Sequence, residues 1–151
     1  MSEVVTSIDI EAPPEAVWEV AMDPARLGEW VTIHRRLGPH SPGPPRRGYE
    51  MEQTLCLRGV NFNVHWQLVA ADEPRHATWH GRGPARSRAE TEYRLTAVGG
   101  GTRFDYRNEF KAPLGPLGAV ASRALVGGLP AREAHATLRR LKGLVERDGS
   151  R

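Results

Sequence analysis

The sequence contains a single cysteine, Cys56, among 151 residues. One thiol forms no internal disulfide and cannot supply the cysteine ligands of a structural zinc site. Stability must therefore come from a hydrophobic core, and the chain is long enough to bury one. We predict a single domain over residues 1–151 that needs no metal and no cofactor.

Long apolar runs are also missing. No window approaches the ~18 consecutive apolar residues of a membrane-spanning helix. The opening MSEVVTSIDIEAPP has no basic segment followed by an apolar stretch, as a secretion signal would. We therefore expect a cytoplasmic protein without an integral membrane segment.

Neither sign of charge dominates the chain. There are 21 Lys and Arg residues against 18 Asp and Glu residues, for a formal net charge of +3. A nucleic-acid-binding surface needs a basic stripe, but the densest cluster, Arg82, Arg86 and Arg88, has no helix-turn-helix, zinc or RNA-binding motif beside it. We expect no nucleic-acid partner.

The common catalytic motifs are absent as well. The sequence has no GxSxG, no HExxH, no Walker motif and no dinucleotide-binding glycine pattern. The glycines of GGGTRF lead into an expected strand, whereas a phosphate cradle leads into a helix. Motifs alone therefore name no reaction.

What the sequence does contain is regular alternation. In residues 60–68, VNFNVHWQL, apolar side chains occupy the even positions and polar ones the odd positions. A period of two is typical of strands with one dry face. The pattern recurs in residues 49–58, 76–80, 88–95 and 104–110, and Gly59 marks a tight hairpin turn. We predict five consecutive antiparallel strands, with an edge strand over residues 4–11.

Helices are predicted at both ends of this run of strands. Prolines at helix starts and the N-cap residue Asp23 indicate two short helices in APPEAVWEVAMD and PARLGEW. From Leu117 to Val145 apolar residues follow helical spacing, with a kink or break near Pro130. A sheet with one apolar face needs a cover, and this C-terminal helix is the element left to supply it.

Residues 31–48 combine four prolines with three glycines. This composition predicts a Pro/Gly-rich loop without regular structure. Loops of this length inside a domain are often lids over a binding site, and a disordered connector is the alternative.

The order of these elements resembles the START-like superfamily, also called SRPBCC or the polyketide cyclase/dehydrase and lipid transport group. The resemblance rests on TSIDIEAPPEAVWEVAMDPARLGEW, VHWQLVAADEPRHATW, GGGTRFDYRNEF and LRRLKGLVE. It implies an α+β helix-grip fold, in which a curved antiparallel six- or seven-stranded sheet wraps a long C-terminal helix, with two short helices after the first strand. The superfamily hosts many activities, so the resemblance by itself assigns none.

The resemblance also implies a cavity between the sheet and the C-terminal helix. Pockets of this kind often measure ~300 Å³ or more. The alternative is that the same side chains fill a solid core. The predicted ligand-binding residues are Trp30, Met51, Gln53, Leu55, Phe62, Val64, Trp66, Trp79, Thr91, Tyr93, Phe104, Tyr106, Asn108 and Leu125.

Three hypotheses about function follow. The first is binding, for sequestration or transport, of a hydrophobic small molecule such as a lipid or polyketide-like compound. The second is a polyketide cyclase or dehydratase acting on an aromatic or poly-β-keto substrate, with Tyr106, Asn108 and His34 as candidate catalytic residues. The third is a protein-interaction module that uses the charged face or the proline-rich loop. We expect a monomer or a homodimer.

Overall fold

The computed structural model describes residues 2–111 and 129–149. Its elements, in chain order, are β1 Ser2–Ile10, α1 Pro14–Ala21, the 3-10 turn η1 Pro24–Arg26, α2 Leu27–Trp30, β2 His34–His40, β3 Glu50–Leu57, β4 Val60–Asp72, β5 His76–Arg82, the 3-10 turn η2 Pro84–Arg86, β6 Arg88–Val98, β7 Gly101–Lys111 and α4 Ala131–Gly149.

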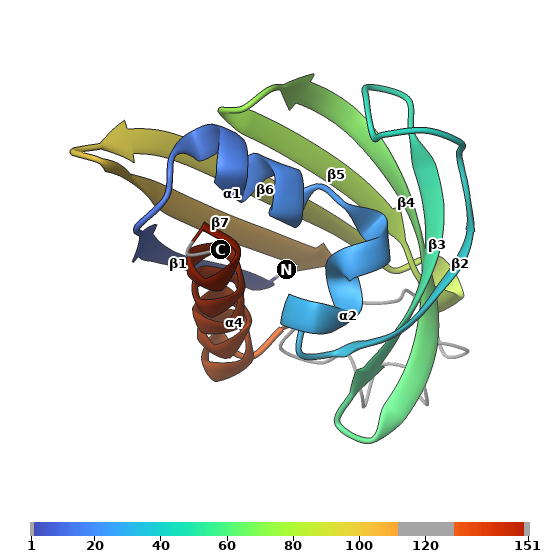
Figure 1. Ribbon diagram of the computed structural model, residues 1–151. Helices are drawn as coiled ribbons and strands as arrows, with labels where there is room; N and C mark the ends of the chain where they lie inside the picture. Colours follow the sequence, from blue (N-terminus) through green and yellow to red (C-terminus); the bar gives the residue numbers. More distant parts are fainter. Residues whose placement is uncertain (1, 112–128, 150–151) are drawn as a thin grey trace.

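The strands form one antiparallel seven-stranded sheet in the order β1-β7-β6-β5-β4-β3-β2. Strands β2 to β7 are therefore neighbours in sequence as well as in space, and β1 joins the far edge by pairing with β7. Figure 1 shows the sheet curving around α4, with α1 and α2 on the same concave side. This is the predicted α+β helix-grip architecture.

Alternation decides which side chains face the helices. On β4 the burial pattern places Val64, Trp66 and Leu68 inside, with Asn63 and Gln67 exposed. The neighbouring strands keep this register, because Met51 on β3 pairs with Trp66. Inward positions of successive strands therefore fall into rows that form one apolar surface.

The turn between β3 and β4 has the predicted position. Only Arg58 and Gly59 separate the two strands, and their φ angles are 51° and 78°. Two successive residues with positive φ are typical of the type I′ hairpin turn, whose twist matches that of the strands.

The helices cover the concave face as the sequence indicates. Asp23 caps η1 by accepting a hydrogen bond from the backbone N–H of Ala25 (3.0 Å). On α4 the buried side chains include Ala134, Leu138 and Leu141, which repeat at helical spacing. The part of the C-terminal helix predicted upstream, from Leu117 to Gly128, lies outside the described residues.

The prediction of an irregular loop over residues 31–48 is wrong for its first part. Strand β2, His34–His40, pairs with β3, and its register shifts between Leu37 and His40. The shift falls at Gly38 and Pro39, and β2 is the edge of the sheet. Proline is tolerated there because an edge strand or a bulge does not need every backbone N–H for pairing.

Candidate functional site

A cavity of about 120 Å³ lies between the sheet and the short helices. The resemblance implied a cavity between the sheet and the C-terminal helix, but among the described residues of α4 only Thr137 lines it. The cavity is larger than the space of a single water molecule but smaller than the volume of ~300 Å³ expected from the sequence. Bulky inward side chains account for the difference, since Trp30, Trp66 and Tyr106 all project into this space. The interior is therefore neither fully packed nor widely hollow.

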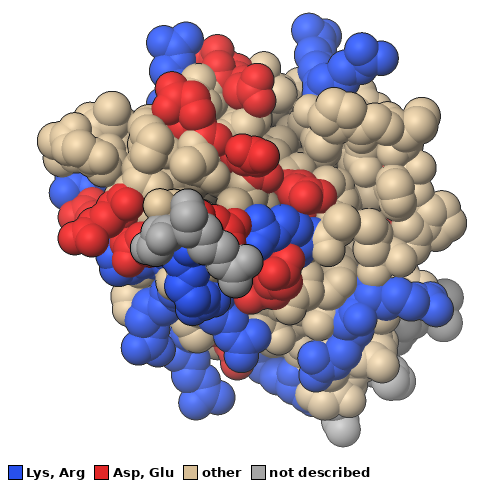
Figure 2. Space-filling model, in the orientation of Figure 1, with Lys and Arg blue, Asp and Glu red and all other residues tan. Residues whose placement is uncertain are grey.

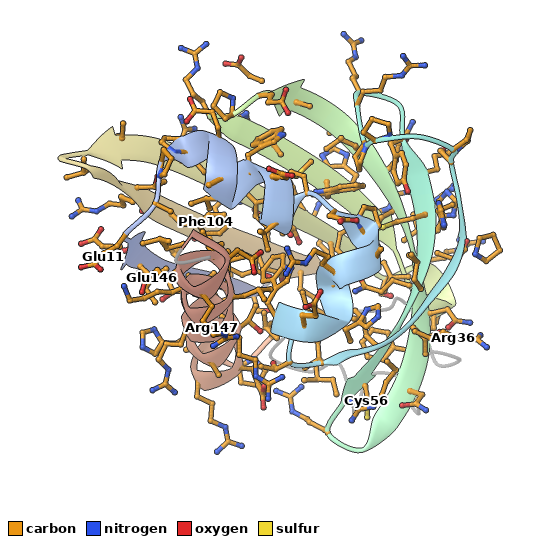
Figure 3. All side chains as sticks on the ribbon, viewed as in Figure 1. Glu11, Arg36, Cys56, Phe104, Glu146 and Arg147 are labelled. Carbon is orange, nitrogen blue, oxygen red and sulfur yellow. The ribbon has the colours of Figure 1, made fainter. Side chains whose placement is uncertain are left out.

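Twelve of the fourteen predicted ligand-binding residues line the cavity. They are Trp30, Met51, Gln53, Leu55, Phe62, Val64, Trp66, Trp79, Thr91, Tyr93, Tyr106 and Asn108. Phe104 does not line it: its side chain is fully buried and packs against Tyr93, with the ring centroids 5.3 Å apart. Figure 3 shows Phe104 on the part of β7 behind α1 and α4. Leu125 lies outside the described residues.

Sequence reasoning missed part of the lining. Alternation places Ser87 and Phe110 on the inward face, and both line the cavity. The missed residues are Ala21, Met22, Pro24, Leu27, Val31, Ile33, Leu57, Gly83, Arg88, Ala89, Leu129 and Thr137. Alternation was a sufficient signal for Leu57, which continues the inward row of β3. No sequence pattern indicated that Pro24 and Gly83 reach the wall.

The polar centre of the cavity lies on β6 and β7. We call Thr91, Tyr93, Tyr106 and Asn108 the tyrosine cluster. The register pairs Thr91 with Asn108 and Tyr93 with Tyr106, and the Asn108 amide Nδ2 donates to the Thr91 hydroxyl at 2.8 Å. The two tyrosine rings stack with centroids 6.0 Å apart. The predicted candidates Tyr106 and Asn108 thus belong to one group of contacting side chains.

Burial disfavours the ionised form of both tyrosines. It raises the pKa of Tyr106 to about 12, although hydrogen bonds from Asn108 and Thr91 partly oppose this. Burial also raises the pKa of Tyr93, and the neighbouring Tyr106 adds to the effect. At neutral pH both phenols are therefore neutral hydrogen-bonding groups, and neither acts as a base.

A second polar group lies on β2, β3 and β4. Gln53 accepts a hydrogen bond from the Trp66 indole Nε1 at 2.8 Å, and its amide nitrogen lies 2.9 Å from His34 Nδ1. An indole N–H only donates, so the oxygen of Gln53 faces Trp66 and its NH₂ group donates to His34. We call these three residues the glutamine bridge.

The hydrogen bond with Gln53 determines which ring nitrogen of neutral His34 carries the proton. Because Nδ1 accepts from Gln53, the proton of the neutral imidazole sits on Nε2. Burial lowers the pKa of His34, which also favours the neutral ring. His34 is not among the lining residues, so the structure places this catalytic candidate behind Gln53 and apart from Tyr106 and Asn108.

Trp30 on α2 lines the cavity and contacts the tyrosine cluster. Its side chain is 1% exposed, and its ring meets Tyr93 edge-on at a centroid distance of 6.1 Å. Among the described residues its indole Nε1 is the one buried side-chain nitrogen or oxygen without a hydrogen-bond partner. Trp30 therefore contributes aromatic surface and leaves a polar atom unsatisfied.

Charged groups gather on the opposite, convex face of the sheet. His65 lies between Glu50 (2.9 Å) and Glu52 (2.6 Å), and His76 lies 2.8 Å from Glu92. Within residues 2–111 and 129–149, no group of three or more His, Cys, Asp and Glu side chains is placed to hold a metal ion. These charges are paired with one another, away from the cavity.

Ionic and polar contacts also hold α4 against the N-terminal part of the chain. Glu146 accepts a hydrogen bond from the backbone N–H of Glu11 at 2.8 Å, and Figure 3 shows the two residues side by side. Arg26 contacts Asp148 at 2.7 Å. Basic side chains gather at the lower edge of the face drawn in Figure 2, and acidic ones are mixed with them higher up.

A curved antiparallel sheet that grips a C-terminal helix and encloses an apolar cavity defines a START-like, or SRPBCC, protein. The chain belongs to the family described as polyketide cyclase / dehydrase and lipid transport, whose model matches residues 1–146. None of the described helices is long and apolar enough to cross a membrane.

Similar proteins span nearly the whole chain. The Mycobacterium tuberculosis protein named Toxin Rv0910 is 28% identical over 127 residues, covering 83% of this chain and 88% of its own. TTHA0849 from Thermus thermophilus has a TM-score of 0.73 at 19% identity, with coverage of 97% and 98%. DynU16, from the dynemicin biosynthetic locus, has a TM-score of 0.65 at 15% identity, covering 97% of this chain and 48% of its own.

Proposed function

We propose that this protein binds a hydrophobic small molecule, such as a lipid or a polyketide-like compound, and sequesters or transports it. The observation that supports this most directly is the cavity wall, which carries aromatic and aliphatic side chains from the sheet and the short helices. The description of the family includes lipid transport, which agrees with the proposal.

Apolar burial supplies the affinity. Each Å² of apolar ligand surface removed from water contributes about 25 cal/mol, so about 200 Å² contributes roughly 5 kcal/mol before the costs of association. Trp30, Trp66 and Trp79 offer flat surfaces that order with little loss of side-chain entropy, because they are already buried.

Titration with the neutral fluorophore N-phenyl-1-naphthylamine tests the proposal, followed by displacement with lipid extracts. We expect saturable fluorescence enhancement. Ala89→Phe, which places a ring at the cavity wall, should weaken binding at least tenfold, whereas Ala71→Phe on an exposed part of β4 should leave it unchanged. Absence of saturable uptake, or equal effects of the two substitutions, would contradict the proposal.

A second candidate function is catalysis of cyclisation or dehydration on an aromatic or poly-β-keto substrate. The tyrosine cluster favours it, because Tyr106 and Asn108 line the cavity and contact each other through Thr91. Such groups polarise a carbonyl in the transition state. DynU16, which lies in a biosynthetic locus, has a similar fold.

Product formation from a synthetic poly-β-ketone thioester tests this second candidate. Tyr106→Phe should lower turnover by about 10²- to 10³-fold, the usual effect of losing one donor to a developing oxyanion. Tyr49→Phe removes a phenol of similar burial outside the cavity and serves as the control. Unchanged product formation in Tyr106→Phe would remove this role.

A further inference from the structure

The described part of the cavity wall is almost free of charge. Among the described residues that line it, Arg88 is the one with a charged side chain, and Arg88 is exposed. The buried polar groups of the described wall, Gln53, Ser87, Thr91, Thr137 and the two tyrosines, are all neutral. A carboxylate or ammonium group moved into this space beyond the reach of Arg88 would lose its hydration and find no counter-ion among the described wall residues.

The tyrosine cluster places a hydrogen-bond donor inside this neutral space. The Asn108 amide donates to the Thr91 hydroxyl, and both residues lie beside Tyr106, which lines the cavity. A phenol O–H group donates as well as accepts, so the Tyr106 hydroxyl can donate to an oxygen atom of a ligand.

The polar groups of the glutamine bridge, by contrast, already have hydrogen-bond partners within the protein. The oxygen of Gln53 accepts from Trp66, and its NH₂ group donates to His34. A ligand oxygen therefore finds a donor at Tyr106 on β7 rather than at Gln53 on β3.

We propose that the cavity selects an uncharged ligand carrying a carbonyl or phenol oxygen, and that the Tyr106 hydroxyl donates a hydrogen bond to this oxygen. The inference rests on the proposed function, because it specifies the ligand of the same cavity. It disfavours fatty-acid-like ligands whose carboxylate would enter the cavity, and it favours ketones, quinones, phenols and similar neutral oxygenated molecules.

Three probes of nearly equal shape separate the contributions: 2-ethylnaphthalene, 2-acetonaphthone and 2-naphthoate. The first has no oxygen, the second has a neutral carbonyl, and the third carries a charge at neutral pH. Dissociation constants are measured by competition with the neutral fluorophore. We expect 2-acetonaphthone to bind about tenfold or more tightly than 2-naphthoate, and more tightly than 2-ethylnaphthalene.

Two substitutions assign these differences to residues. Tyr106→Phe should weaken binding of 2-acetonaphthone by about three- to tenfold, the usual effect of one neutral hydrogen bond, and leave 2-ethylnaphthalene unchanged. Arg88→Gln should leave the order of the three probes unchanged. Tyr49→Phe, outside the cavity, is the control for loss of a buried phenol.

The outcomes distinguish this inference from the proposed function. If 2-naphthoate binds as tightly as the ketone and loses affinity in Arg88→Gln, the ligand is anionic and the inference is overturned, while the proposed function stands. If Tyr106→Phe weakens the ketone and the hydrocarbon equally, the hydrogen bond is overturned. If none of the three probes binds saturably, both proposals fail.

Discussion

At the scale of single residues, Gln53 shows how one amide determines the chemistry of its neighbours. It receives the Trp66 indole hydrogen and donates to His34, so His34 is neutral and carries its proton on Nε2. The lowered pKa has a consequence for stability. Below pH about 6.5 the unfolded chain takes up this proton more readily than the folded one, so His34 makes the fold less stable as the pH falls.

Replacing Gln53 with glutamate should reverse the state of His34. A carboxylate accepts hydrogen bonds from both Trp66 and His34, so the pKa of His34 should rise and the neutral ring should carry its proton on Nδ1. NMR titration of the His34 ring nitrogens measures both changes. Gln67→Glu, the same substitution on the exposed side of β4, should leave His34 unaffected. An unaltered His34 titration in Gln53→Glu would contradict the bridge.

His65 on the convex face has the opposite pH dependence. Hydrogen bonds to Glu50 and Glu52 raise its pKa, because only the protonated ring donates from both nitrogens. A raised pKa in the folded state contributes stability that is present below pH about 6.5 and is lost as the pH rises through the folded-state value.

His65→Gln should therefore lower the free energy of unfolding more at pH 6 than at pH 8.5. Urea unfolding at the two pH values measures the difference. The double substitution Glu50→Gln and Glu52→Gln removes the two carboxylates that His65 contacts, so it should abolish the same pH dependence. Equal losses at both pH values in His65→Gln would show that the contact does not depend on the charge of the ring.

At the scale of elements, β5 contains a position that has to remain small. A Cβ atom on Gly81 would lie 2.7 Å from Cζ3 of Trp66 and 2.8 Å from Cγ1 of Val64. Both neighbours line the cavity. Glycine therefore lets the Trp66 ring lie flat on β5, and this packing sets the shape of the wall.

Gly81→Ala should destabilise the protein by about 1–3 kcal/mol, because the added methyl group overpacks the wall. It should also weaken binding of the apolar fluorophore, since Trp66 has to move. Urea unfolding and fluorophore titration measure the two effects. Gly100→Ala, where a Cβ would meet nothing within 4 Å, should change stability by no more than about 0.5 kcal/mol. Equal stability of the two variants would contradict the packing argument.

Strand β2 shows where element prediction from composition fails. Four prolines and three glycines over residues 31–48 favour a loop, and the segment from Ser41 to Gly48 indeed contains no strand or helix. The residues from His34 to His40 form a strand because β3 offers a free edge for pairing. That edge exists only in the assembled sheet, so the local sequence carries no signal for it.

At the scale of the whole molecule, most of the tryptophans lie on the wall of the cavity. Of the four tryptophans, Trp30, Trp66 and Trp79 line the cavity, and Trp18 on α1 does not. A bound ligand therefore lies next to three indole rings contributed by a helix and two strands. Intrinsic fluorescence should change when the cavity is filled.

Trp18→Phe should preserve the ligand-dependent change of tryptophan emission, whereas Trp66→Phe should reduce it. The reason is distance to the ligand, since Trp18 is buried outside the cavity wall. Emission spectra recorded during titration with 2-acetonaphthone test this. A change that disappears in Trp18→Phe and persists in Trp66→Phe would place the ligand elsewhere.

The sequence by itself determined which residues form the strands from β3 to β7 and which side chains face inward, because a period of two is a local property of each strand. Together with the cavity that the START-like resemblance implies, this identified twelve of the residues that line the cavity. Tertiary structure decided what alternation cannot encode. It placed Phe104 in the packed core, put His34 behind Gln53, brought Gly83 to the wall and limited the cavity to about 120 Å³. These features depend on the curvature of the sheet and on contacts between distant strands, which appear only when the layers pack together.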